Sequence, residues 1–131
     1  MKRTILVLAV SLFAAYFCTT EASAQTKVRV KFGRGSSSLT VRGTIAGYRY
    51  VDYILGAKAG QTLTGKLTSA EPSVEFVIFK PDMDNIDEMM GDTNWSGQLP
   101  VNGNYTIRVL MPRSQARRKT TATYRLWISI R

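Results

Sequence analysis

Apolar and polar residues alternate with a period of two along most of the chain after residue 25, a pattern that indicates half-buried β-strands. In residues 26–32, Val28, Val30 and Phe32 alternate with lysine and arginine. The last eleven residues, 121–131, repeat the pattern, with Tyr124 and Leu126 on one face and Arg125 and Trp127 on the other. The alternation therefore predicts strands with one face in a core and one in solvent.

Glycine, proline and asparagine divide the pattern into about eight strands. The predicted strands cover residues 26–32, 38–45, 48–57, 61–69, 74–80, 95–99, 104–111 and 121–131. Residues 74–80 are apolar without alternation, which is typical of a strand covered on both faces. No segment after residue 24 shows a helical period, so we predict a single all-β domain, an antiparallel β-sandwich or jelly roll, with a closed barrel as the alternative.

Residues 1–24 have the features of a secretory signal peptide. A basic start is followed by an apolar run over residues 5–17, too short to span a bilayer comfortably, and by small residues that place cleavage after Ala24. A lipoprotein signal ending at Cys18 is the alternative, but the bulky Tyr16 and Phe17 do not suit it. We therefore expect a periplasmic domain of residues 25–131 without cysteine or disulfide.

Charge is unevenly distributed along the chain. The chain has 18 basic and 9 acidic residues, and removing residues 1–24 (Lys2, Arg3 and Glu21) leaves 18 − 2 against 9 − 1, a net charge of +8. All acids of residues 25–131 except Asp52 lie within residues 71–92, while residues 112–119 form a basic loop. The excess of positive charge either forms a solvated cationic surface or attracts an anionic partner, such as an acidic enzyme cleft, lipopolysaccharide or cell-wall polymer. Nucleic acid also has negative charge, but it is not found in this compartment.

The residue types leave little room for catalysis. Without histidine or a mature cysteine, the domain cannot assemble a Ser-His-Asp triad, thiol catalysis or most zinc sites. We expect no enzyme activity, no cofactor and no metal. The acidic segment 82–88 has oxygen ligands that could hold calcium, but it lacks the pattern of a helix-loop-helix site, and a solvated loop is the preferred interpretation.

Several motifs resemble the periplasmic inhibitors of g-type (goose-type) lysozyme of Gram-negative bacteria. The matching residues cover nearly the whole mature chain and are Val30, Phe32, Gly35, Ser37, Ser38, Gly43, Ile45, Gly47, Tyr48, Tyr50, Tyr53, Ala57, Lys58, Gly60, Gln61, Gly97, Gln98, Leu99, Pro100, Gly103, Tyr105, Arg108, Val109, Leu110, Arg113, Ala116, Arg117, Tyr124, Ile128 and Ile130. The motif Gly97–Pro100 and the Gly-x-Tyr that follows are also typical of bacterial pre-peptidase C-terminal domains, which are jelly rolls. The narrower signal is Gly47-Tyr48-x-Tyr50 together with the arginines of the basic loop.

The resemblance implies a lysozyme-binding patch formed by Tyr48, Arg113 and Arg117. Tyr50, Arg118 and Asn102 are candidate secondary contacts. Asn102 stands where the family signature Ser-Gly-x-Tyr has serine, and we interpret the rest of that motif as a turn glycine and a core tyrosine.

The expected function is inhibition of a g-type lysozyme by binding in its active-site cleft, which would protect bacterial peptidoglycan. The alternative is a module of pre-peptidase C-terminal type that binds cell-wall glycan or lipopolysaccharide through Tyr48, Tyr50, Trp127 and the basic face. The charged first strand favours a monomer. Preference among the g-, c- and i-type lysozymes stays open.

Overall fold

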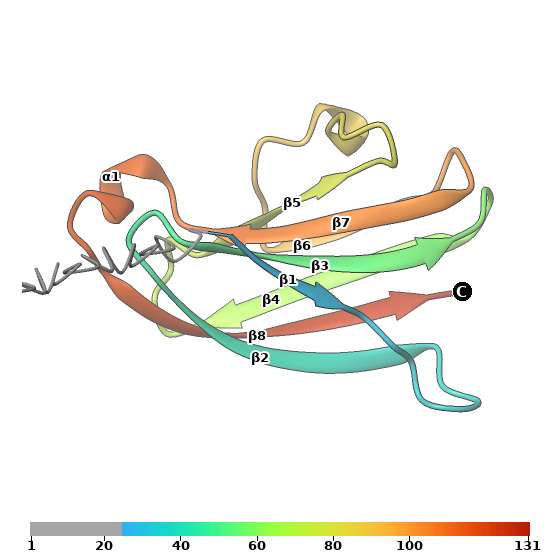
Figure 1. Ribbon diagram of the computed structural model, residues 1–131, viewed down its shortest axis with the longest axis horizontal. Coiled ribbons are helices and arrows are strands. Elements are labelled where there is room, and N and C mark those ends of the chain that lie inside the picture. Colours follow the sequence, from blue (N-terminus) through green and yellow to red (C-terminus); the bar gives the residue numbers. More distant parts are fainter. Residues whose placement is uncertain (1–24) are drawn as a thin grey trace, which may run out of the picture.

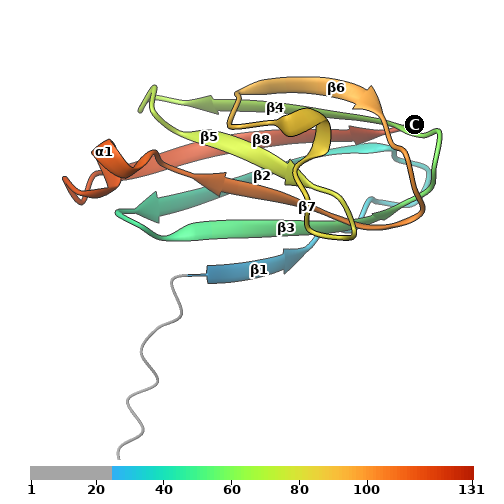
Figure 2. The same cartoon turned by 90° about the horizontal axis from the view of Figure 1, so that it is seen from above.

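The computed structural model describes residues 25–131, in which eight strands form two four-stranded sheets packed face to face (Figures 1 and 2). Sheet A has the order β1 (Gln25–Arg29), β3 (Tyr50–Ala57), β7 (Gly103–Leu110) and β5 (Glu75–Phe79). Sheet B has the order β2 (Ser38–Ala46), β8 (Thr121–Ile130), β4 (Thr62–Ser69) and β6 (Asn94–Gln98). The predicted signal peptide lies outside the described residues.

The prediction of an all-β sandwich is confirmed, because each predicted strand overlaps an observed one. Two details of the prediction are wrong. Strand β1 pairs with β3 in parallel, not antiparallel, because β2 crosses to the other sheet between them. The described chain also contains a one-turn helix, α1 (Arg113–Ala116), and a 3₁₀ turn, η1 (Ile86–Glu88), both too short to produce a helical period in the sequence.

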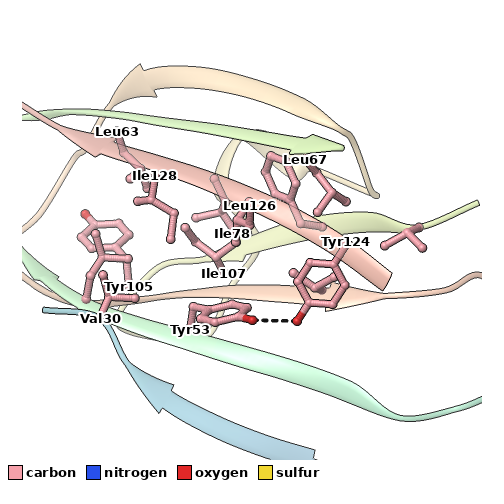
Figure 3. Close-up of a cluster of buried hydrophobic side chains, with 14 of the residues drawn as sticks. Val30, Tyr53, Leu63, Leu67, Ile78, Tyr105, Ile107, Tyr124, Leu126 and Ile128 are labelled. Atoms are coloured by element: carbon pink, nitrogen blue, oxygen red, sulfur yellow. Dashed lines mark hydrogen bonds between the residues drawn. The ribbon is translucent and has the colours of Figure 1, made fainter. Parts of the chain in front are cut away.

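The inward faces of the two sheets form one apolar core (Figure 3). The core residues that are less than 2% exposed include Leu55, Leu63, Phe76, Ile78, Leu99, Tyr105, Ile107, Val109, Tyr124, Leu126 and Ile128. The predicted alternation of β8 is confirmed, since Tyr124, Leu126 and Ile128 point inward while Arg125 is exposed. Strand β1 follows its predicted alternation less well, because Val28 remains 37% exposed at the edge of the sheet.

Strand β5 is covered on both faces, as its continuous apolar sequence predicts. Phe76 and Ile78 belong to the core, and Val77 on the opposite face is also buried. The acidic segment after β5 folds back along this edge, with backbone hydrogen bonds in both directions between Phe76 and Asp92. Ile86 and Met89 anchor the segment to the core. The long loop is therefore a packed part of the sandwich.

A buried hydrogen bond of 2.7 Å joins the hydroxyl groups of Tyr53 in sheet A and Tyr124 in sheet B (Figure 3). Burial raises the pKa of both tyrosines above the usual value, so both stay protonated and neutral in the core. Gly43 in β2 makes room for this pair, because a Cβ added there would overlap the hydroxyl oxygen of Tyr124. The sheets are thus joined at a point where only glycine fits.

Replacing Gly43 by alanine tests this close approach. The added methyl group overlaps a buried, hydrogen-bonded tyrosine that has no free space, so we expect the free energy of unfolding to fall by about 1–3 kcal/mol. Urea denaturation followed by tryptophan fluorescence measures the change. Gly33→Ala is the matched control, because its Cβ would meet nothing closer than 4.0 Å, and it should change stability by less than about 0.5 kcal/mol. Equal stability of the two variants would contradict the packing argument.

Candidate functional site

The basic loop of the sequence folds into one helical turn, α1, between β7 and β8. The carbonyl of Pro112 accepts hydrogen bonds from the amides of Gln115 (3.0 Å) and Ala116 (2.9 Å), and that of Arg113 accepts one from Arg117 (3.0 Å). Ala116 is 1% exposed and fixes the turn to the sandwich. The arginines of this segment are consequently carried by an ordered turn.

The turn between β2 and β3 carries Tyr48 and passes from sheet B to sheet A. Gly47 adopts a left-handed conformation (φ +59°), which glycine accepts without a steric cost, and the Arg49 amide donates to the Ala46 carbonyl at 3.2 Å. This backbone leaves Tyr48 at the tip, with 59% of its surface exposed. A tyrosine so exposed contributes little to the core and is available for contact.

The Tyr48 turn and α1 lie against each other at one end of the sandwich, where Figures 1 and 2 both show them side by side. The Gly47 amide donates to the carbonyl of Thr120, just after α1, at 3.1 Å. A Cβ on Gly47 would lie 3.6 Å from the Ala116 carbonyl oxygen. Segments about 70 residues apart in sequence are therefore joined through their backbones.

The structure brings together the three residues expected to form the patch. Arg113 and Arg117 are both exposed and stand four positions apart, the spacing that places two side chains on one face of a helical turn. Tyr48 projects from the adjacent turn. We call Tyr48, Arg113 and Arg117 the end patch.

The end patch lies in a region of uncompensated positive charge. Arg118 and Lys119 follow in the same segment and are exposed, and neither they nor the patch arginines have a carboxylate within 4.0 Å in the part of the chain that the structure describes. Arg49, next to Tyr48, is also exposed and unpaired there. Sequence reasoning missed Arg49, although its position beside Tyr48 in the same turn was a usable signal.

Of the three expected secondary contacts, Arg118 and Tyr50 lie close in sequence to patch residues, whereas Asn102 does not. Arg118 is in the α1 segment. Asn102 is at the other end of the sandwich, because β7 begins next to it and runs about 25 Å before it reaches α1. Its side-chain oxygen accepts a hydrogen bond of 2.8 Å from the Ala59 amide, which indicates a role in joining two turns. The structure does not bring Asn102 to the end patch.

Tyr50 lies on the outer face of sheet A, where its ring packs against a partly buried ion pair. Arg108 donates from Nε and Nη2 to the two oxygens of Asp52, at 2.8 and 3.1 Å. The centres of the Tyr50 and Phe79 rings lie 4.3 and 4.8 Å from the guanidinium carbon of Arg108. The hydrogen bond to Asp52 raises the pKa of Arg108 further above its usual value. Asp52 and Arg108, which alternation places on the solvent face, are thus the centre of a local cluster, and Asp52 is only 2% exposed.

The described residues contain no group of three His, Cys, Asp or Glu side chains placed to hold a metal ion. Residues 25–131 likewise enclose no pocket. Within the same range, no helix has the length and apolar character needed to cross a membrane. What the site offers is a cationic end of the sandwich with one exposed aromatic ring.

Comparison with known proteins gives a consistent set of relatives. A curated inhibitor of g-type lysozyme from Escherichia coli (strain K12) is 30% identical over 125 residues, which cover 92% of each chain. The crystal structure of a periplasmic inhibitor of g-type lysozyme from Aeromonas hydrophila is 36% identical, with a TM-score of 0.74 over 82% of this chain and 97% of the other. No family model matches the chain.

The likeness to pre-peptidase C-terminal domains extends to the fold alone. The domain of that type from the Bacillus anthracis collagenase has a TM-score of 0.53 over 82% of this chain and 94% of its own, at 10% identity. The motifs shared with that group are therefore features of the sandwich.

Replacing Gly47 by valine tests whether the turn holds α1 in place. A β-branched residue is strongly disfavoured in the left-handed region, so the turn must shift and its hydrogen bond to Thr120 should weaken. Hydrogen exchange at the amides of Arg117, Arg118 and Lys119 is expected to accelerate. Gly60→Val is the control, since Gly60 also has positive φ (+86°) and a hydrogen bond to another loop, from its amide to Leu99, but at the opposite end.

Both substitutions should lower the free energy of unfolding by about 1–2 kcal/mol. Only Gly47→Val should accelerate exchange in α1. Unchanged exchange in Gly47→Val, or equal acceleration in both variants, would show that the turn does not support α1.

Proposed function

The chain belongs to the family of inhibitors of g-type lysozyme, and we propose that it inhibits a g-type lysozyme in the periplasm by placing the end patch in the active-site cleft of that enzyme. The observation that carries this proposal is the backbone contact between the Tyr48 turn and α1, which brings the segments that carry the aromatic ring and both arginines together at one end of the sandwich. Blocking the cleft would protect peptidoglycan from hydrolysis.

The chemistry of the two surfaces is complementary. Glycoside hydrolases of this kind work with carboxyl groups in a groove that holds the glycan. Arginine pairs with carboxylates through two parallel hydrogen bonds, and Arg113 and Arg117 have no carboxylate within 4.0 Å in residues 25–131 that would compete. Tyr48 supplies rigid apolar area with a polar tip beside them. An interface of about 1,600 Å² around such anchors is typical of tight inhibitors.

Inhibition by this end requires no catalysis by the inhibitor. Residues 25–131 hold no histidine and no cysteine, and the end patch contains no carboxylate. The proposal is therefore a stoichiometric, non-covalent complex. Its specificity comes from local complementarity of charge and shape.

Substituting the patch residues tests this model. Arg113→Ala, Arg117→Ala and Tyr48→Ala each remove an exposed side chain, so folding should stay intact while binding weakens by about 2 kcal/mol or more, roughly 30-fold in the inhibition constant. The measurement is the clearing of a turbid cell-wall suspension by a g-type lysozyme at increasing inhibitor concentration. The c- and i-type lysozymes run in parallel define the class preference.

Two further variants sharpen the result. Arg113→Lys keeps the charge but loses the bidentate fork, and it should bind more weakly than the unmodified protein. Arg34→Ala removes an exposed charge from the β1–β2 connection and should inhibit normally. Full inhibition by all three alanine variants of the patch would rule out this end of the sandwich as the contact.

We also propose that the protein is exported and that its mature form begins at Gln25. All eight described strands, from β1 (Gln25–Arg29) onward, follow the proposed cleavage site after Ala24. Mass spectrometry of protein purified from the periplasm should give the mass of residues 25–131. A lipid-modified chain beginning at Cys18 would contradict this assignment.

A further inference from the structure

The outer face of sheet B carries cations and no acids. None of its four strands contains aspartate or glutamate, and their charged residues are Arg42 in β2, Lys66 in β4 and Arg125 in β8, all exposed. Serine and threonine fill most of the remaining outward positions. We call Arg42, Lys66, Arg125 and Trp127 the sheet patch.

Arg42 and Arg125 stand directly opposite each other on neighbouring antiparallel strands. Like charges in this position destabilise a sheet. The two ion pairs of the described residues, Lys80–Asp82 and Arg108–Asp52, involve neither of them, so no carboxylate offsets the repulsion. An anion bound across the two guanidinium groups would remove that cost.

Trp127 is next to the arginine pair along β8 and is paired across the sheet with Thr40 and Lys66. The Lys66 amine lies 5.4 Å from the centre of the indole ring. The ring is partly exposed and has hydroxyl groups around it, including those of Thr40 and Thr64. An indole face with nearby hydroxyls suits a sugar ring, whose C–H groups pack on the aromatic surface while its hydroxyls form hydrogen bonds.

The sheet patch fits an extended polymer better than a membrane or a small molecule. Residues 25–131 enclose no pocket that would hold a small ligand. The exposed large apolar residues Val28, Tyr48, Met83, Met90 and Val101 all lie outside sheet B, so the partly exposed Trp127 has no exposed large apolar neighbours on this face with which to form a membrane-inserting surface. Figure 1 shows β2, β8 and β4 running side by side as one open face, with α1 at its end.

We propose that the outer face of sheet B binds a carboxylate-bearing glycan, the peptidoglycan of the cell wall, through Arg42 and Arg125 with Trp127 beside them. This inference rests on the proposed periplasmic function, because it places the inhibitor on the polymer that lysozyme cleaves. The glycan occupies a sheet face and the end patch remains free, so the two partners bind at the same time.

Co-sedimentation of the mature protein with purified peptidoglycan sacculi tests this assignment. The variant Arg42→Thr/Arg125→Thr should bind sacculi about tenfold more weakly, because it loses both charge-assisted contacts. It should still inhibit g-type lysozyme on a soluble glycan substrate. Its thermal midpoint should stay equal or rise, since the substitution also removes the like-charge pair.

The matched control is Lys31→Thr/Lys58→Thr, which removes the same charge from exposed positions outside sheet B. It should bind sacculi within about twofold of the unmodified protein if the contact is local and not a bulk charge effect. Sacculi whose carboxyl groups have been converted to amides should bind neither the unmodified protein nor the control.

Three outcomes would overturn the proposal. The first is an equal loss of sacculus binding in both double variants, and the second is undiminished binding of the unmodified protein to amidated sacculi. The third is that the arginine variant loses binding to vesicles of anionic lipid but keeps its binding to sacculi. The sedimentation contains no lysozyme, so its failure leaves the inhibition assay unaffected. Conversely, failure to inhibit lysozyme would not change which residues bind sacculi.

Discussion

The hydrogen bond from the Gly47 amide to the Thr120 carbonyl is the contact on which the candidate site depends. This hydrogen bond joins the turn between β2 and β3 to the segment between α1 and β8, and it places the Tyr48 turn beside α1. Ala116 supports the same contact, since its methyl group is buried while Arg113 and Arg117, which precede and follow it in the segment, are exposed. Because backbone and a small side chain form the junction, the large charged side chains remain available for a partner. An ordered turn of this kind also reduces the conformational entropy lost on binding.

This junction needs a sandwich that is stable without a disulfide, and the core provides it. Tyr53 and Tyr124 close the gap between the sheets with a hydrogen bond, and Gly43 lets their rings approach the backbone of β2. On the outer face of sheet A, the Asp52–Arg108 pair joins the neighbouring strands β3 and β7, and two aromatic rings pack against it. Both clusters connect β3 to strands distant in sequence. The strand that begins after the Tyr48 turn is thus held on both of its faces.

The sequence predicts the local structure well and the pairings poorly. Alternation locates most of the strands and the inward residues of β8, because a period of two is a property of neighbouring residues, and a continuous apolar run locates β5. It cannot show that β1 runs parallel to β3 or that Asp52 meets Arg108, since these depend on register between segments far apart. The sequence pattern also does not predict the helical turn α1, because four residues are too few to show a helical period. Tyr48, Arg113 and Arg117 came from family resemblance, and the structure adds their proximity together with Arg49, which the motif did not include.

The positions of the positive charges separate binding at the end patch from binding at the sheet patch. At physiological ionic strength the field of an exposed charge falls off over about 8 Å, whereas the strands of the sandwich extend about 25 Å from one end to the other. Most of the sheet patch is therefore screened from a partner held at the end patch. The net charge of the domain cannot by itself explain recognition of an enzyme cleft, and Arg113 and Arg117 must act through direct contact. Cations that lie too far away to assist that contact, such as Arg42 opposite Arg125, are instead placed to bind the second anionic partner that we propose, which would offset their mutual repulsion.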